Sequence, residues 1–191
     1  IRRGALDLNV AEAEIKLDEN GTPVSIEKAE RGISNRMIEE FMLKANECVA
    51  EYAKLNELPI LYRVHEDPDP EKLEGFEQFV FNLGYRIKGS KGKVHPKALQ
   101  AVLHKAEGQP EEAVISRLML RSLQKARYAP QPLGHYGLAA PDYCHFTSPI
   151  RRYPDLVVSR AITAMLTGKR ATLTGDKLDD AAMRSSDCER S

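Results

Sequence analysis

The residues best suited to chemistry lie together between Tyr143 and Leu156, where two adjacent arginines, two hydroxyl side chains, aromatic rings and two prolines precede a helix-like stretch. Arginine carries a planar, permanently charged group whose N–H donors match the oxygens of a phosphate. Arg151 and Arg152 are therefore candidate phosphate ligands. The hydroxyl groups of nearby Thr147 and Ser148 could add neutral hydrogen bonds to the same anion.

The aromatic residues of this segment extend the interpretation from phosphate to nucleic acid. The rings of Phe146 and Tyr153 could stack on bases, and the prolines would keep the loop stiff, so that little ordering is needed on binding. The alternative is that the two arginines are solvated or paired with Asp142 and Asp155. The residue types alone leave both interpretations open.

The apolar patterning predicts the elements that must position this segment. Alternating apolar residues around Asn20-Gly21 predict a β-hairpin over 14–27. Ser34 is the expected N-cap of a long helix, whose apolar stripe from Met37 to Tyr52 is expected to pack in the core. The other expected elements are a strand over 60–65 and helices over about 71–83, 96–106, 111–127 and 154–166.

Composition limits the class of protein. The chain has 191 residues, with 28 basic and 28 acidic side chains, so any nucleic acid must be bound by a local basic patch. Three widely spaced cysteines predict neither a disulfide framework nor a cysteine zinc site, and a reducing, cytoplasmic setting is expected. No apolar run approaches the roughly 20 residues of a membrane helix, so no membrane partner is expected. Both ends of the sequence suggest a piece of a longer protein.

The segment from His145 to Leu156, HFTSPIRRYPDL, resembles the signature of the ribonuclease II/ribonuclease R family of 3′-to-5′ exoribonucleases. The resemblance extends over nearly the whole chain, through further ordered segments at 3–7, 38–46, 61–66 and 134–139. It implies an α+β fold, the helix-rich C-terminal part of an RNB catalytic domain with short strands and an N-terminal β-hairpin. Residues 1–191 would then be a partial RNB domain that lacks its upstream half and the flanking RNA-binding domains.

The resemblance also implies an activity: processive, magnesium-dependent hydrolysis of single-stranded RNA from its 3′ end, releasing nucleoside 5′-monophosphates. Arg151 matches the family arginine that contacts the scissile phosphate, where it would neutralise developing charge. The residues expected to support or line the same site are Thr147, Ser148, Arg152 and Tyr153.

A second family position, a glutamate that contacts the terminal nucleotides, matches the Glu39-Glu40 pair. Helical geometry favours Glu39, because it borders the apolar stripe on the same side as Asn46, whereas Glu40 lies nearly opposite the stripe. A solvated helix face is the alternative for both acids. His135 is a candidate for lining the RNA channel, with a hydrogen-bonded structural histidine as the alternative.

Several features depart from the family pattern. The metal-binding aspartates of the family precede all the matched segments, whereas Asp179-Asp180-Ala181 follows the signature and is taken as a coincidence. Asp7 alone cannot assemble a two-metal site, so the Mg²⁺ ligands are expected upstream and the isolated chain is expected to be inactive. Ser159 stands where the family usually has histidine. A non-catalytic RNA-binding or interaction module is the alternative function.

One further residue of the segment has a candidate property. Cys144 lies near Arg151 and Arg152 in the sequence, which could lower the pKa of its thiol. No base or reaction is evident for it.

Overall fold

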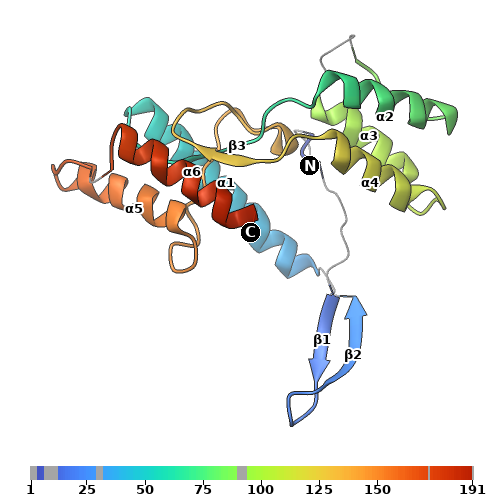
Figure 1. The fold of residues 1–191 in the computed structure, drawn as a ribbon, viewed down its shortest axis with the longest axis horizontal. Coiled ribbons are helices and arrows are strands. Elements are labelled where there is room, and N and C mark those ends of the chain that lie inside the picture. The colour runs from blue at the N-terminus through green and yellow to red at the C-terminus, as the bar shows by residue number, and fades with distance from the viewer. Residues whose placement is uncertain (1–3, 7–12, 29–31, 90–93, 172, 191) are drawn as a thin grey trace.

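The computed structural model describes residues 4–6, 13–28, 32–89, 94–171 and 173–190. They form two helical lobes joined through short strands, with a hairpin that extends away from both lobes (Figure 1). This confirms the expected helix-rich α+β fold. Arg3 and Asp7, which belong to the first matched segment, lie outside the described residues. No described helix is long and apolar enough to cross a membrane.

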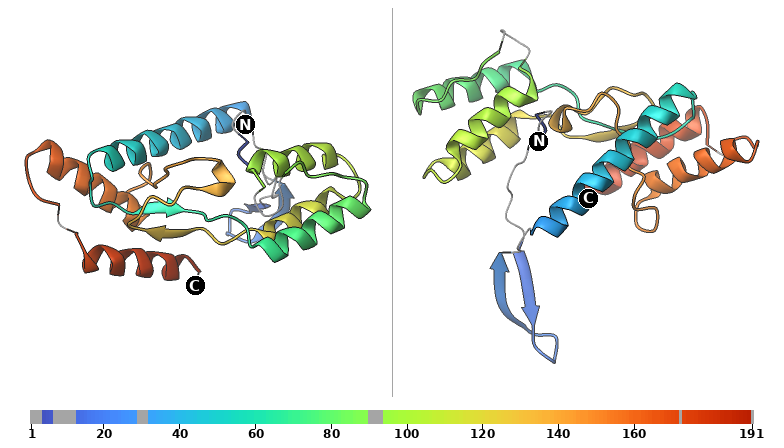
Figure 2. Two further views of the ribbon diagram at one scale, coloured as in Figure 1. Left: turned by 90° about the horizontal axis from the view of Figure 1, so that it is seen from above. Right: turned by 180° about the vertical axis from the view of Figure 1, so that it is seen from behind.

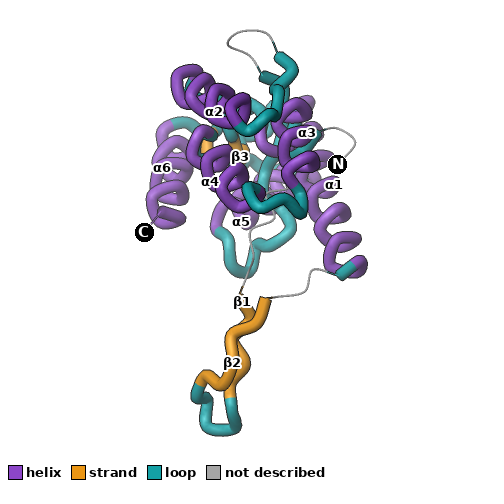
Figure 3. Tube along the Cα trace, turned by 90° about the vertical axis from the view of Figure 1, so that its right-hand side faces the viewer, coloured by secondary structure: helices purple, strands orange, loops and turns teal. Residues whose placement is uncertain are grey.

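The hairpin agrees with the alternation in the sequence. Strands β1 (Ala13–Leu17) and β2 (Pro23–Lys28) are antiparallel, with Ile15 opposite Ile26. In the turn, Gly21 takes a positive φ of 80°, and the side chain of Asp18 accepts hydrogen bonds from the backbone N–H groups of Asn20 and Thr22, both at 2.8 Å. The hairpin projects clear of the helices in two views (Figures 1 and 3).

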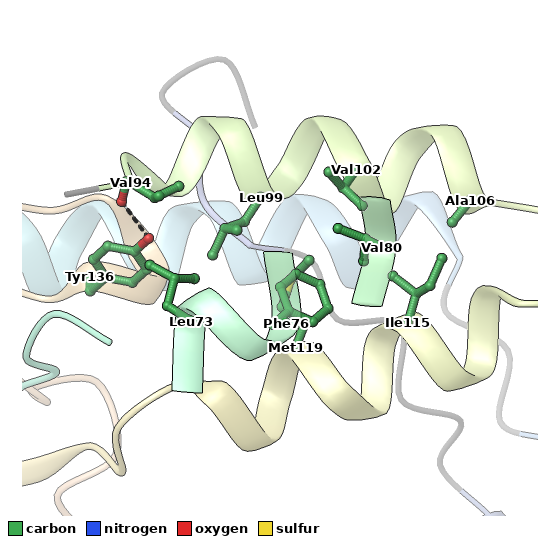
Figure 4. Packing of buried hydrophobic residues seen from close by; sticks show 10 residues of the cluster. All are labelled: Leu73, Phe76, Val80, Val94, Leu99, Val102, Ala106, Ile115, Met119 and Tyr136. Atoms are coloured by element: carbon green, nitrogen blue, oxygen red, sulfur yellow. Dashed lines mark hydrogen bonds between the residues drawn. The ribbon is translucent and has the colours of Figure 1, made fainter. Parts of the chain in front are cut away.

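The first lobe consists of helices α2 (Pro70–Asn82), α3 (Pro96–Ala106) and α4 (Glu112–Ser122). Both α2 and α3 begin at a proline, as the missing N–H and fixed φ of proline favour. Asp69 caps α2 and His95 caps α3 through side-chain acceptors. The apolar sides of the three helices meet in one core, formed by Leu73, Phe76, Val80, Leu99, Val102, Ala106, Ile115 and Met119 (Figure 4).

The second lobe places a two-stranded ribbon between helices. Strands β3 (Tyr62–Val64) and β4 (Arg127–Ala129) are antiparallel, and helices α1 (Ile33–Leu55) and α6 (Asp176–Arg190) lie on opposite sides of them (Figure 2). Helix α5 (Tyr153–Leu166) contributes to the cores on both sides. Its Val158 packs with Ala50 and Ala53 of α1, and its Val157 packs with Leu178 and Ala181 of α6.

Two expected helix boundaries are wrong. The helix expected over 111–127 ends at Ser122; Leu123 is already extended, with ψ of 152°, and Arg127 begins β4 opposite Val64. A three-residue strand has too short a pattern to be recognised from sequence. Helix α1 begins at Ile33 with Gly32 at the N-cap and no side-chain cap, so Ser34 is not the cap.

The apolar stripe of α1 is also not the core face that its spacing predicts. Met37, Ile38 and Phe41 are 53–66% exposed, while the buried residues of α1 are Asn46, Ala50 and Ala53. Only the C-terminal half of α1 lies beside the strands; its N-terminal half extends beyond the lobes toward the hairpin (Figure 1). Within the described chain, no element covers that half.

Candidate functional site

The segment that carries the arginines is anchored first to α1, through Asn46. The buried side chain of Asn46 accepts a hydrogen bond from the backbone N–H of Phe146 at 3.0 Å and donates one to the Tyr143 hydroxyl at 3.0 Å. Its backbone carbonyl accepts from the thiol of Cys144 at 3.4 Å. One polar residue in the middle of a helix thus holds three successive parts of the segment.

The second anchor is Asp155, in the first turn of α5. Its side chain is fully buried, and its Oδ1 accepts from the backbone N–H of Ser148 at 2.7 Å and from Nη2 of Arg152 at 2.8 Å. The N-terminus of a helix favours such a carboxylate. The expected alternative of a paired arginine therefore holds for Arg152. Asp142 instead binds Lys54, at 2.8 and 2.9 Å.

Arg151 lies at the exposed tip of the turn that these anchors close. Its backbone N–H donates to the carbonyl of Ser148 at 3.3 Å, while its side chain forms no ion pair with any residue the structure describes. The preceding Ile150 is fully exposed. An uncommitted guanidinium on a turn held at both ends is an anion ligand that needs little ordering before it binds.

The other predicted residues of the segment point in different directions. Tyr153, the first residue of α5, is 48% exposed and lines a groove together with Arg151. Thr147 Oγ1 is buried and has no hydrogen-bond partner in the described chain, so this hydroxyl is turned away from solvent. Ser148 contributes its backbone N–H to Asp155. Ser159 stands where the family usually has histidine. Its hydroxyl donates a hydrogen bond to the backbone carbonyl of Asp155 at 2.9 Å.

The two candidate glutamates differ in exposure. Glu39 is half-buried and Glu40 is exposed, the order expected from their helical positions. Glu39 precedes Asn46 by two turns of α1, roughly 10 Å along the axis. The side of α1 that carries Glu39 is thus the side onto which the arginine segment is anchored. The role of Glu39 in binding RNA stays a prediction.

His135 lies in a row of buried and half-buried rings. Its ring is 5.1 Å from that of His65 and 5.3 Å from that of Tyr143, which in turn lies 5.8 Å from His145. Burial, reinforced by nearby positive charge, lowers the pKa of His135 and of His145 to about 3. A histidine that stays neutral at pH 7 offers no charge to a phosphate. The Nδ1 atom of His135 accepts from the backbone N–H of Leu138 at 3.3 Å, which favours the structural alternative.

Cys144 does not have the lowered thiol pKa that its sequence neighbours suggested. The side chain is completely buried, and this burial, with the nearby charge of Asp155, raises its pKa to about 12. The thiol is therefore a packing and hydrogen-bonding group.

The described residues offer no obvious metal site. Among them, no group of three or more histidine, cysteine or acidic side chains is placed to hold a metal ion. Asp179 and Asp180 are exposed on α6, and Asp180 pairs with Arg184 at 3.0 Å. The residues present in the described chain thus do not fit the Mg²⁺ ion that the resemblance implies.

Arg63 has a role that no pattern in the sequence indicated. Its guanidinium binds both carboxylate oxygens of Glu189, at 2.5 and 2.9 Å, and lies 4.8 Å from the centre of the Tyr128 ring. These contacts tie β3 and β4 to the end of α6, across 126 positions of sequence. No local pattern could have paired residues so far apart.

Comparison with known proteins gives consistent results. The model of the RNB domain matches residues 1–168. Ribonuclease R 1 of Lactococcus lactis is 47% identical over 193 residues, which cover 99% of this chain and 24% of the relative. The chain thus spans about a quarter of the length of that relative.

Two solved structures are similar in fold. Mycoplasma genitalium RNase R in complex with ribose methylated single-stranded RNA matches with a TM-score of 0.88 and 32% identity, over 99% of this chain and 30% of that one. Yeast Ssd1, a pseudonuclease, matches with a TM-score of 0.67 and 29% identity, over 83% of this chain and 20% of that one.

Proposed function

The chain belongs to the RNB domain family, and from this premise we propose that it forms the C-terminal part of the catalytic domain of a 3′-to-5′ exoribonuclease. The proposed substrate is single-stranded RNA, and the products are nucleoside 5′-monophosphates. One observation carries the proposal. Arg151 is an exposed arginine that forms no ion pair within the part of the chain that the structure describes, and it lies on a turn that Asn46 and Asp155 hold at its two ends.

In this proposal each residue of the segment has a distinct task. Arg151 contacts the scissile phosphate and neutralises the charge that builds on its oxygens. Arg152 is already bound to buried Asp155, so it positions the turn. Tyr153 offers its half-exposed ring to a base. Glu39, a carboxylate, accepts hydrogen bonds from ribose hydroxyls of the terminal nucleotides.

The resemblance further implies Mg²⁺. Because the described residues do not fit a metal site, we propose that its ligands belong to the parts of the longer relatives that this chain does not span. The task of this chain is then to bind and position RNA, and by itself it is inactive. A cytoplasmic location is proposed from the cysteine usage alone.

A second candidate function is a non-catalytic RNA-binding module. It is favoured by the similarity to yeast Ssd1, whose description as a pseudonuclease shows that this fold can persist without nuclease activity. The two candidates share the RNA-binding surface and differ in whether a complete domain built with this segment cleaves RNA.

The first test uses the chain itself, with 5′-labelled single-stranded RNA and Mg²⁺. We expect binding without shortening of the RNA. Arg151→Ala should weaken binding about tenfold to a hundredfold, the loss of a charged hydrogen-bond pair. Arg121→Ala, an exposed arginine on α4 of the other lobe, is the matched control and should leave binding unchanged. Equal affinity of both variants would contradict the role of Arg151.

The second test separates the enzyme from the binding module. The segment of the Lactococcus relative that matches this chain is exchanged for residues 1–191. Stepwise shortening from the 3′ end, abolished by Arg151→Ala, supports the exonuclease. A folded chimera that binds RNA and leaves it intact supports the binding module.

A further inference from the structure

A groove of about 800 Å³ opens beside the turn that carries Arg151, on the side of α6. The turn and the start of α5 form one wall, with Arg151 and Tyr153, and α6 forms the other, with Lys177 and Arg184. Helix α6 lies across the β3–β4 ribbon from α1 (Figure 2). The groove is therefore separate from the side of α1 that bears Glu39.

The ion pairs of the groove leave it positively charged. Its two carboxylates are both neutralised: Asp180 pairs with Arg184, and Glu189 pairs with Arg63 of β3. Of the remaining cations, Arg152 is bound to Asp155. Arg151 and Lys177, one from each wall, form no ion pair with any residue in the described ranges. Two uncompensated cations thus face the same hollow.

Apart from Ser185 and Cys188 of α6, the remaining lining is aromatic or aliphatic. Tyr128, Tyr153, Pro154, Leu173 and Ala181 line the groove between the charged groups. Cations together with aromatic and aliphatic surface match the two halves of a nucleotide, because phosphates bind the cations while bases stack on the rings. The volume lies in the range of ligand sites, about 300 to 1,000 Å³.

We propose that this groove binds single-stranded RNA next to the phosphate held by Arg151, with Lys177 as a backbone phosphate ligand and Tyr153 as the stacking surface for a base. The proposal rests on the proposed function, since both use Arg151. It adds α6, which the RNB domain match at 1–168 does not include, to the RNA-binding surface.

The test measures the affinity of the chain for a fluorescein-labelled oligoadenylate by anisotropy over a series of salt concentrations. Lys177→Ala should weaken binding several-fold and reduce the salt slope by about 0.7, the value for one phosphate contact on a single strand. The matched control is Lys169→Ala, which removes an exposed lysine that does not line the groove. It should change neither quantity.

The stacking half of the proposal is tested separately at Tyr153. Tyr153→Phe keeps the ring and should bind the oligoadenylate as tightly as the wild type does. Tyr153→Leu should reduce the affinity about tenfold. Equal affinity of the Phe and Leu variants would overturn the stacking role. Circular dichroism of each variant verifies that the helices are intact.

The outcomes separate this proposal from the proposed function. If Arg151→Ala weakens binding while Lys177→Ala matches Lys169→Ala, the groove is not an RNA site and the proposed function stands. If Lys177→Ala weakens binding and Arg151→Ala does not, α6 binds RNA, but the role of Arg151 and the placement of the RNA next to it are both wrong. If neither substitution weakens binding, both proposals fail.

Discussion

Asp155→Ala removes only one carboxylate group, yet we expect it to lower the free energy of unfolding strongly. The carboxylate is fully buried and holds two donors, the backbone N–H of Ser148 and the guanidinium of Arg152. Removing it leaves a largely buried arginine without its counter-charge and a backbone N–H without its acceptor. Both defects lie on the turn that presents Arg151.

The magnitude follows from these two contacts. Breaking a buried ion pair from one side costs about 3–5 kcal/mol. The Arg152 side chain is 22% exposed, so it recovers some hydration and the cost falls toward the lower limit. The unsatisfied N–H of Ser148 adds about 1 kcal/mol or more. We therefore expect Asp155→Ala to lower the free energy of unfolding by about 4 kcal/mol.

Urea-induced unfolding followed by circular dichroism measures this change. Asp155→Asn keeps an oxygen that can accept from the N–H of Ser148, so its free energy of unfolding should fall by clearly less than that of Asp155→Ala. This variant can be measured even if the alanine variant does not fold. The control is Asp180→Ala, which removes an exposed ion pair with Arg184 and should cost less than about 1 kcal/mol. A loss below about 1 kcal/mol for Asp155→Ala would refute the assigned role of this carboxylate.

Three other perturbations have defined outcomes. Asn46→Leu should lower the free energy of unfolding by about 2–3 kcal/mol in urea, because it removes the partners of two buried groups. Between pH 6.5 and pH 3, His135 and His145 are protonated in the unfolded chain but stay neutral in the folded protein. Stability should therefore fall as the pH is lowered, with a slope from these two groups approaching about 2.7 kcal/mol per pH unit, and replacing both with phenylalanine should flatten the curve. In thermal unfolding, Phe41→Ser should shift the midpoint little because its ring is 66% exposed, whereas Ile60→Ala, at a completely buried position, should cost about 2–5 kcal/mol. Equal effects at the two positions would contradict the packing described for α1.

The parts of the fold that follow from local chemistry were predictable. Asn20-Gly21 requires a tight turn between alternating strands, and the prolines at positions 70, 96 and 154 each lie in the first turn of a helix. The motif around Arg151 was predictable as well, because it is contiguous in the chain. These features depend on residues a few positions apart, and their energetics are set by the backbone and immediate neighbours.

Burial was much less predictable. The spacing of Met37, Ile38 and Phe41 is that of a core face, yet these residues are exposed because no element of the described chain lies against that half of α1. Asn46 shows the opposite case, a polar residue that is buried. It can be buried because it forms hydrogen bonds with three groups of a segment about 100 positions away.

The sequence by itself determined the hairpin, most of the helices, the family and the position of the arginine motif, since each depends on residues close together along the chain. Only the tertiary structure decided which arginine is available. Arg152 is committed to Asp155, and Arg151 is not. The same holds for Cys144 and His135, whose pKa values depend on burial among distant elements and not on their sequence neighbours. Desolvation and pairing are properties of the packed molecule, because the groups that exclude water or supply a counter-charge come together only when the chain folds.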